Sequence, residues 1–303
     1  VIYVGASGIR YWRNLAGNAW SAAYDVTSLP ADSSAASITA VDILGSGTAC
    51  LVWSCAVPGD GVAPLRYVDL ASGIKPHLLT SIDNGLGAST RIAYAPSTQF
   101  YLADRAAGRP WTTHLGFPVQ VVTRIETYDD VRKVQFVSEY TYSDGYYDGY
   151  EREYRGFGYV EQRDTESDPA NAGIGLFADR PPPVNGKVAQ PPVITKTWFH
   201  TGVWLSGGPL ATSPAIVLDA GMTPDESRDA YRALRGSPLR QEIYADDGTA
   251  LAGLPYSVTE HGYQLRRLQP ALADVNGVFV AQPRETIEHH IERGSDPRVA
   301  HAV

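Results

Sequence analysis

The chain has 303 residues, of which 44% are hydrophobic and 19% charged, and its formal net charge is −8. This acidic excess would repel a phosphate backbone, so nucleic-acid binding is not expected. No apolar run reaches the length of roughly 18 residues that a transmembrane helix needs, so we expect no membrane contact. The 29 glycines, 21 prolines and 18 tyrosines favour a mainly β fold with many short strands and turns.

The first residue is Val1, and Met222 is the only methionine of the chain. No signal-peptide pattern is visible near Val1. We therefore expect a piece of a longer polypeptide whose targeting signals lie elsewhere.

Short strands separated by glycine-containing turns are predicted over residues 1–70. The segment VDILGSGTACLVW, residues 41–53, predicts a hairpin whose turn contains Gly45 and Gly47. It resembles the integrin-type propeller repeat, but Asp42 is the one acidic residue that remains, so we expect no calcium loop. A nucleotide-binding loop is also not expected, because no helix pattern and no lysine follow the glycines.

Cys50 and Cys55 are the only cysteines. If they share one strand, their odd spacing places the two side chains on opposite faces, where a disulfide is geometrically poor. A zinc site needs about four ligands, and no second pair of cysteines follows. We expect two buried, reduced thiols.

Alternating strands are predicted over most of residues 76–162. An Asn-Gly pair supplies the positive φ angles of a tight turn, so a hairpin turn is predicted at Asn84 and Gly85. Residues 116–128 and 133–142 alternate between apolar and polar side chains, which predicts two further strands.

The intervening stretch YLADRAAGRPW, residues 101–111, predicts an ion-paired loop in which Asp104 lies beside Arg105 and Arg109. Neither Ser7 nor Ser46 matches the G-x-S-x-G pattern of a nucleophile elbow. No catalytic or cofactor-binding residue is therefore predicted.

The tyrosine-rich stretch YTYSDGYYDGYEREYRGFGYVEQ, residues 140–162, predicts a strand over 150–162 and a connection over 143–149. On that strand Tyr150 and Tyr154 would share one face. Glycines that alternate with aromatic residues mark places where rings cover bare backbone. The structural turn and packing positions that we predict are Gly45, Gly47, Asn84, Gly85, Gly156, Gly158, Tyr150 and Tyr154.

The carboxylates of this stretch allow two alternatives. Glu151 and Glu153 could be the acid pair of a glycosidase, but both lie beside arginines that favour ionised carboxylates, so an ion-pair face is preferred. Asp144, Asp148 and Glu151 could hold calcium, but the alternating acidic spacing of a calcium loop is missing. We predict no metal ligand here.

The tyrosines of the same stretch allow a different function. Tyrosine suits a half-wet sheet face, because its ring packs while its hydroxyl reaches water. Tyr146, Tyr147 and Tyr150 could therefore form the surface of an independent carbohydrate- or surface-binding β module. This alternative stays open beside a purely structural hairpin.

Residues 163–192 are rich in Pro, Gly, Asp and Asn without any period, which predicts a loop or linker. Residues 193–303 resume the strand pattern and contain one predicted helix, 224–235. Thr223 can cap this helix, Pro224 is suited to its first position, and Glu226 completes a capping box. Gly236 can end it.

The stretch ETIEHHIE, residues 285–292, contains two histidines and three glutamates. The peptidase pattern His-Glu-x-x-His is absent, and the apolar residues alternate with the charged ones. A strand with a charged face is predicted here in preference to a zinc site.

Several long segments resemble, in order, the middle region of the B component of bacterial insecticidal toxin complexes, the Tc toxins. The same region occurs in plasmid-virulence toxins and in Rhs-type shell proteins. The segments that carry the resemblance are residues 41–54, 67–111, 117–122, 144–165, 232–248, 255–267 and 285–301.

The resemblance implies a mainly β fold in which a β-propeller is followed by a large twisted antiparallel sheet, part of an Rhs-type hollow shell. Residues 1–75 would be terminal propeller blades. Residues 76–162 and 193–303 would be two shell-wall segments, the second with the helix, and 163–192 the linker between them.

The resemblance also implies a non-enzymatic role in toxin delivery. The shell would encapsulate a toxic polypeptide and be completed by the C component, and the propeller would dock to the pore-forming A component. No catalytic residue carries over. The protein would be made in the bacterial cytoplasm and act in a secreted or extracellular complex.

Overall fold

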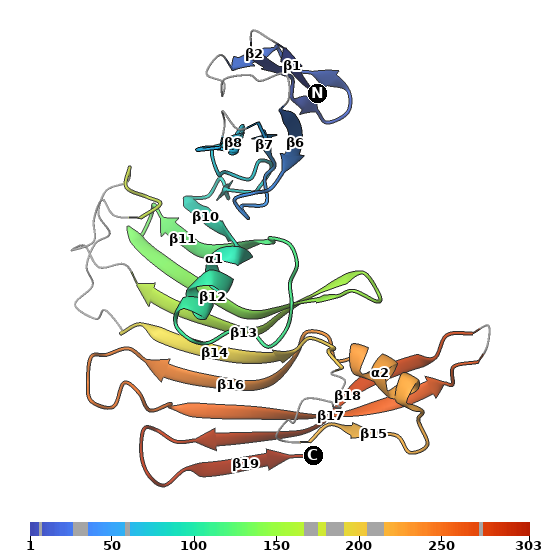
Figure 1. Ribbon diagram of the computed structural model, residues 1–303. Coiled ribbons are helices and arrows are strands. Elements are labelled where there is room, and N and C mark those ends of the chain that lie inside the picture. Colours follow the sequence, from blue (N-terminus) through green and yellow to red (C-terminus); the bar gives the residue numbers. More distant parts are fainter. Residues whose placement is uncertain are drawn as a thin grey trace. The chain divides into compact units, whose positions relative to one another are not determined.

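A computed structural model describes residues 1–5, 8–26, 36–57, 61–166, 175–179, 191–204, 215–272 and 275–303. The chain divides into two compact units, Val1–Leu78 and Leu79–Val303 (Figure 1). Within the described ranges, no helix has the length and apolar character that crossing a bilayer requires. Each unit is mainly β, as predicted.

The first unit is built from short antiparallel strands. They form two three-stranded sheets, in the orders β1-β2-β5 and β6-β7-β8, and the pair β3-β4. Ile9, Leu51 and Trp53 pack together as its buried apolar core. The strands are β1 (Ile2–Gly5), β2 (Gly8–Tyr11), β3 (Asn14–Leu15), β4 (Ala19–Trp20), β5 (Tyr24–Val26), β6 (Ser37–Val41), β7 (Cys50–Ser54) and β8 (Leu65–Val68).

The turn between β6 and β7 is held by Asp42. Its two carboxylate oxygens accept hydrogen bonds from the backbone N–H groups of Ser46 and Gly47, at 2.9 and 2.7 Å. Gly45 and Gly47 have φ angles of 63° and 79°, a region that glycine enters without steric cost. Asp42 therefore serves as a turn cap in this hairpin.

The two cysteines lie at either end of β7. Both are buried and neither forms a disulfide, as predicted. Burial raises the pKa of the Cys50 thiol, which favours its neutral form.

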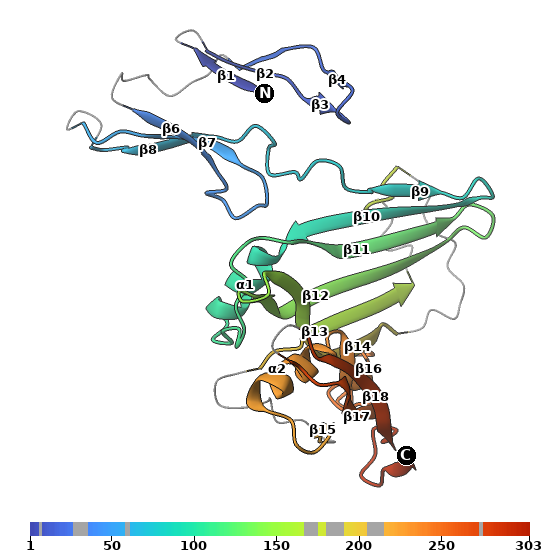
Figure 2. The same cartoon turned by 90° about the vertical axis from the view of Figure 1, so that its right-hand side faces the viewer.

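The second unit contains one long antiparallel meander. Strands from β9 to β19 neighbour one another in sequence order, except that β15 pairs in parallel with β17. The sheet is strongly twisted, since β10–β13 cross the view in Figure 2 while β16–β18 are seen nearly end-on. Its strands are β9 (Ser81–Asp83), β10 (Ala88–Pro96), β11 (Gln120–Asp129), β12 (Val134–Asp148), β13 (Glu153–Glu166), β14 (Val193–His200), β15 (Val217–Leu218), β16 (Ser237–Ala245), β17 (Ser257–Gln269), β18 (Val278–His290) and β19 (Arg298–Ala302).

The turn from β9 to β10 contains the predicted Asn-Gly pair. Gly85 has a φ of 66°, and the side-chain oxygen of Asn84 accepts hydrogen bonds from the N–H groups of Leu86 and Ala88. Asn84 thus closes a turn longer than the two-residue type, and a second positive φ falls on Gly87.

A helix that the sequence analysis missed follows β10. Helix α1 (Ser97–Ala106) occupies part of the stretch predicted as a loop, so the expectation of one helix was wrong. Its N-cap is Pro96, which provides no side-chain hydrogen bond, and its first turn holds no acidic residue. The helix is stabilised by tertiary contacts, among them the edge-to-face pair of Phe100 and Tyr142 on β12.

The one helix that the sequence predicted, over residues 224–235, is present as the second helix of the chain. Helix α2 (Pro224–Arg232) begins where expected, with a reciprocal capping box between Thr223 and Glu226. It ends three residues before the predicted limit of 235, and Gly236 takes a positive φ of 78° beyond it. The local capping signals therefore located its start better than its end.

The tyrosine-rich hairpin turns later than predicted. Strand β12 continues to Asp148, so the expected connection over 143–149 is almost wholly strand. A register shift at Tyr146 and Tyr147, together with the φ of 96° at Gly156, interrupts the two-residue alternation. Strand β13 then runs to Glu166, into the predicted linker, of which 167–174 and 180–190 lie outside the described residues.

The rings of this hairpin cover Gly145. A Cβ atom there would lie 2.8 Å from the Trp111 indole and 3.1 Å from the Phe157 ring. By contrast, a Cβ on Gly156 would meet nothing within 4 Å, and one on Gly158 would meet the Asp144 side chain at 3.1 Å. The close approach of rings to bare backbone therefore occurs at Gly145, a position the sequence analysis did not select.

We predict that Gly145→Ala lowers the free energy of unfolding by about 1–3 kcal/mol, because the new methyl group overpacks the ring cluster. Gly253→Ala is the control, since its Cβ would enter open space. Urea-unfolding midpoints of the two variants test this. Equal midpoints would mean that the aromatic rings shift to accept the methyl group without loss of stability, and would contradict the prediction.

We also predict self-association through the ends of the meander. β9 and β19 are the terminal strands of the described sheet, and such strands present unpaired backbone groups to other chains. Sedimentation velocity of residues 1–303 should show concentration-dependent oligomers, reduced by Val299→Lys on β19. A monomer at every concentration would contradict this prediction.

Candidate functional site

One face of the long sheet carries charged side chains in register across its strands. Residues directly opposite one another on paired strands share a face. Two rows of such neighbours run across β13, β14 and β16, and we call this surface the ladder face. The rows are Glu161–Lys196–Glu242 and Tyr159–Trp198–Arg240, and the second continues to Glu260 on β17.

Charges on the ladder face are paired laterally. Arg240 contacts both Glu242 and Glu260, and His289 lies 3.7 Å from Glu260. Toward the other end of the sheet, Arg163 contacts Asp246 at 2.7 Å and Glu139 at 3.9 Å. These arginines and their carboxylate partners are therefore held in ion pairs along and between the strands.

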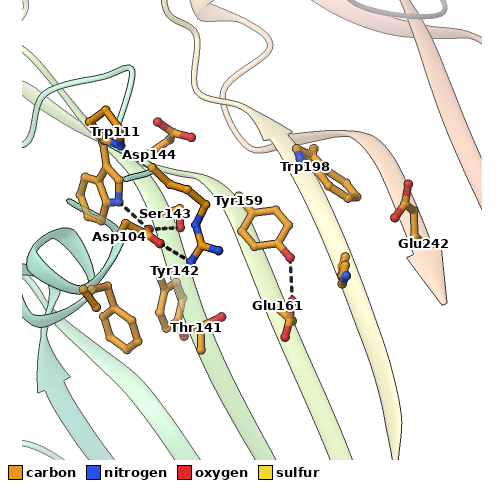
Figure 3. A pocket seen from close by; sticks show the side chains of 15 residues that line it. Asp104, Trp111, Thr141, Tyr142, Ser143, Asp144, Tyr159, Glu161, Trp198 and Glu242 are labelled. Carbon is orange, nitrogen blue, oxygen red and sulfur yellow. Dashed lines mark hydrogen bonds and ion pairs between the residues drawn. The ribbon is translucent and has the colours of Figure 1, made fainter. Parts of the chain in front are cut away.

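A hollow of about 800 Å³ opens on this face between α1 and strands β12, β13, β14 and β16 (Figure 3). We call it the aromatic pocket. Trp111 forms one wall, and Tyr159 and Trp198 lie on neighbouring strands with ring centroids 5.1 Å apart. Its polar lining includes Asp104, Arg109, Asp144, Glu161, Lys196 and Glu242.

Asp104 fastens α1 to the wall of the aromatic pocket. Its carboxylate accepts hydrogen bonds from Arg109 at 3.0 Å, Trp111 at 3.0 Å and Ser143 at 2.5 Å. Burial alone would raise the pKa of Asp104, but these three donors outweigh burial and lower it below the usual value. The predicted ion pair with Arg109 is thus present, on a helix and not in a loop.

Tyrosine hydroxyls at the pocket are held in their neutral form. Burial, followed by a 2.8 Å hydrogen bond to Glu161, raises the pKa of Tyr159. Burial likewise raises the pKa of Tyr142 to about 12, and its hydroxyl donates to the Val122 carbonyl. These phenols act as hydrogen-bond donors and not as bases.

A buried carboxylate lies near the β11 end of the same face, and the sequence analysis missed it. Glu126 is fully buried and accepts hydrogen bonds from Arg124, from Gln135 at 2.8 Å and from the Leu176 N–H at 2.9 Å. A Cβ on Gly175 would lie 2.5 Å from this carboxylate. Glu126 therefore seats the segment 175–179 on the sheet.

The same segment is held by Arg91. Its guanidinium donates to Asp179 and to the Leu176 carbonyl, and it lies 4.3 Å from the centroid of the Phe177 ring. Phe177 is buried against Tyr128, with ring centroids 5.7 Å apart. Part of the predicted linker is thus packed against the strands.

Three arginines of and beside α2 bind the turn of the tyrosine-rich hairpin, and we call this set the arginine clamp. Their spacing of four and three residues places them on one helical face. Arg228 lies 4.6 Å from the centroid of the Tyr150 ring, and Arg232 contacts Glu151 at 2.9 Å. Arg235 pairs with Glu153.

Beneath the arginine clamp lies a buried cation. The Arg155 side chain is 1% exposed and pairs with Asp148 at 3.0 Å and with Glu153 at 3.1 Å. A buried charge is tolerated only with such partners, because desolvation is costly. Arg155 therefore ties the end of β12 to β13.

A buried histidine lies beside the same helix. His200 is fully buried, its Nδ1 accepts a hydrogen bond from the Gly202 N–H at 2.9 Å, and its ring lies 5.5 Å from that of Tyr231. Burial lowers the pKa of His200 to about 4, so the imidazole is neutral at pH 7.

The three tyrosines of the surface-binding alternative have different neighbours. Tyr147 packs edge-to-face on Phe117, at 5.0 Å between ring centroids. Tyr150 lies in the turn beneath Arg228, and Tyr146 is partly buried. Tyr147 and Tyr150 therefore each contact one neighbouring side chain, although Tyr150 remains 78% exposed.

The carboxylates of the other two alternatives also have partners. Glu151 and Glu153 contact arginines of the clamp, and Glu153 and Asp148 both contact Arg155. Asp144 accepts hydrogen bonds from the N–H and hydroxyl of Thr112. Across the ranges that the structure describes, no group of three or more His, Cys, Asp or Glu is arranged to hold a metal ion.

The stretch 285–290 lies on β18, as predicted, and each of its histidines faces a carboxylate. His289 is near Glu260 and His290 is 3.5 Å from Glu288. The His289–Glu260 contact lies on the ladder face, whereas His290 and Glu288 lie on the other face of β18.

Comparison with protein families assigns the chain to a family. The family of the insecticide toxin TcdB middle/N-terminal region matches residues 18–174, and that of the TcdB middle/C-terminal region matches residues 229–303. The chain belongs to the TcdB middle/N-terminal region family, whose match covers more than half of it. None of the curated proteins matches this chain.

Solved structures give the same assignment. The crystal structure of TcdB2-TccC3-TEV is 27% identical over 99% of this chain, with a TM-score of 0.78, and that of TcdB2-TccC3 is 26% identical over 99%, also at 0.78. The Photorhabdus luminescens Tc holotoxin pore is 29% identical over 99%, at 0.78. The chain spans only 14–15% of the length of these solved chains.

We predict that Asp148→Asn lowers the free energy of unfolding by on the order of 3 kcal/mol, because it leaves the buried Arg155 short of negative charge. Asp246→Asn removes a partner from an ion pair that is 40% and 43% exposed, and should cost less than about 1 kcal/mol. Urea unfolding of both variants compares them. A cost for Asp148→Asn no larger than that of the control would refute the buried role.

We predict that His200 makes the fold less stable as pH falls from 6.5 toward 4. In that window the unfolded chain binds a proton at His200 that the folded chain excludes, so stability declines by up to about 1.4 kcal/mol per pH unit. His200→Gln should remove this component of the slope, whereas His114→Gln, on an exposed residue, should keep it. Unfolding midpoints measured at several pH values test the difference.

Proposed function

We propose that the chain is a non-enzymatic structural segment of a toxin-delivery shell of the Rhs type. The observation that carries this proposal is the uninterrupted antiparallel meander from β9 to β14 and from β16 to β19, whose ladder face is lined with paired charges. A continuous sheet without backbone gaps is what a barrier needs, because each strand satisfies the hydrogen bonds of the next.

In this proposal residues 76–162 and 193–303 form shell wall, and β9 and β19 continue into neighbouring strands of the complete protein. Terminal strands of a wall require partners, because their outer backbone groups would otherwise stay exposed to other chains. The long twisted sheet supports this assignment, since twist gives a wall its curvature.

Residues 1–75 would be terminal blades of a β-propeller. Two small three-stranded antiparallel sheets in the first unit are the supporting observation, since propellers repeat small sheets of this kind. This part would dock to the pore-forming A component. The similarity to a chain of the Tc holotoxin pore supports that partner.

The wall would be completed by the C component and would enclose its toxic polypeptide. Relatives of this chain crystallised as TcdB2-TccC3 support the pairing. The complex would act outside the bacterium, after synthesis in its cytoplasm. A chemical role for the wall is not part of the proposal, because Glu139, Glu242 and Glu260 are engaged in ion pairs and Glu161 accepts a hydrogen bond from Tyr159.

The test is a chimera in which this chain replaces the corresponding segment of TcdB2, co-produced with TccC3. We expect closed particles in electron micrographs and protection of the enclosed part of TccC3 from added protease. Native TcdB2 is the positive control, and a chimera carrying Asp148→Asn reports the dependence on wall stability.

Two results would contradict the proposal. One is a chimera that folds but leaves TccC3 open to protease, because a wall segment must close the particle. The other is full protection when the segment is deleted, because the wall would then not need it.

A further inference from the structure

The aromatic pocket contains a ring platform that is fixed in place. Tyr159 and Trp198 are directly opposed on β13 and β14, with 55° between their ring planes. Each is partly exposed and lines the hollow. The Tyr159 hydroxyl donates to Glu161, which restrains the ring. A ligand with a flat apolar face would therefore meet pre-positioned aromatic surface.

Polar groups with unused hydrogen-bonding capacity surround the platform. The Lys196 ammonium lies 4.5 Å from the centroid of the Tyr244 ring and forms no ion pair with any carboxylate in the described ranges. Its neighbours across the strands are Glu161 and Glu242, and Glu242 is already engaged by Arg240 and Tyr244. Lys196 can donate to a ligand, and Glu161 can accept from one.

The charges around the pocket disfavour a charged ligand. An anion drawn to Lys196 would lie between the carboxylates of Glu161 and Glu242. A cation drawn to those carboxylates would meet Lys196, and Arg109 lines the opposite wall. A neutral ligand that both donates and accepts hydrogen bonds avoids both repulsions.

We propose that the aromatic pocket binds a neutral pyranose sugar. The C–H face of the ring would stack on Trp198 and Tyr159, while its hydroxyls accept from Lys196 and donate to Glu161. A hollow of about 800 Å³ leaves room for one or two such rings. Binding without hydrolysis is meant, since Glu242 is held by two donors and Glu161 by the Tyr159 hydroxyl.

This site differs from the surface of Tyr146, Tyr147 and Tyr150 considered from the sequence. Tyr150 contacts Arg228 of the arginine clamp and does not line the aromatic pocket. The inference does not depend on the shell proposal, because it rests on the pocket alone.

The experiment is saturation-transfer NMR and titration calorimetry on the 303-residue chain with methyl pyranosides of glucose, galactose, mannose and N-acetylglucosamine. We expect one of them to bind with a Kd of about 1 mM or tighter. Trp198→Ala should weaken binding about tenfold or more through lost stacking. Lys196→Met keeps a long unbranched side chain but removes the ammonium group, so it should also weaken sugar binding.

Tyr150→Ala is the matched control and should bind as the unaltered chain does. Circular dichroism and unfolding midpoints establish that each variant is folded. The proposal is overturned if none of the four sugars binds, or if Trp198→Ala and Lys196→Met leave binding unchanged. It is also overturned if Tyr150→Ala abolishes binding, which would assign the sugar to the tyrosine-rich turn.

Discussion

Register between neighbouring strands is the constraint on which the second unit depends. A slip of one residue between β13 and β14 would send Lys196 and Trp198 to the opposite face and separate them from Glu161 and Tyr159. The ion pairs that cross between strands, Arg240–Glu260 and Arg163–Glu139, join residues that are directly opposed in the observed register. Each pair on a surface contributes little alone, but together they select one alignment of the meander among several that backbone hydrogen bonds would permit.

Departures from regular register have a structural use. The irregularity at Tyr146 and Tyr147 and the positive φ of Gly156 bend the tyrosine-rich hairpin. Its turn then reaches the arginine clamp, where charged and aromatic side chains of the hairpin meet one face of α2. The clamp and the buried Arg155 couple the β12–β13 hairpin to a helix that packs on β17 and β18. Distant parts of one sheet are thus linked by the partly exposed ion pairs of the clamp, while the desolvated Arg155 joins β12 to β13 within the hairpin.

The tyrosine-rich stretch, residues 140–162, has a packing role in the structure. Its rings pack around Gly145 and line the aromatic pocket, and its carboxylates neutralise arginines. A sheet built this way places most of these acidic groups beside basic partners, whereas an acid catalyst needs two carboxylates converging on one substrate. The same arrangement leaves Lys196 and the ring platform beside it with capacity for a ligand.

By itself the sequence determined the mainly β fold class, the Asn84-Gly85 turn, the capped start of α2 and the absence of a Cys50–Cys55 disulfide. Each of these depends on short-range backbone and side-chain chemistry. It also carried the family resemblance. The tertiary structure alone decided α1, which lacks capping signals, the burial of Glu126, and the partners of the hairpin carboxylates. The physical reason is sequence distance: Glu151 and Arg232 are 81 residues apart, and no local period reports which strands a twisted sheet brings together.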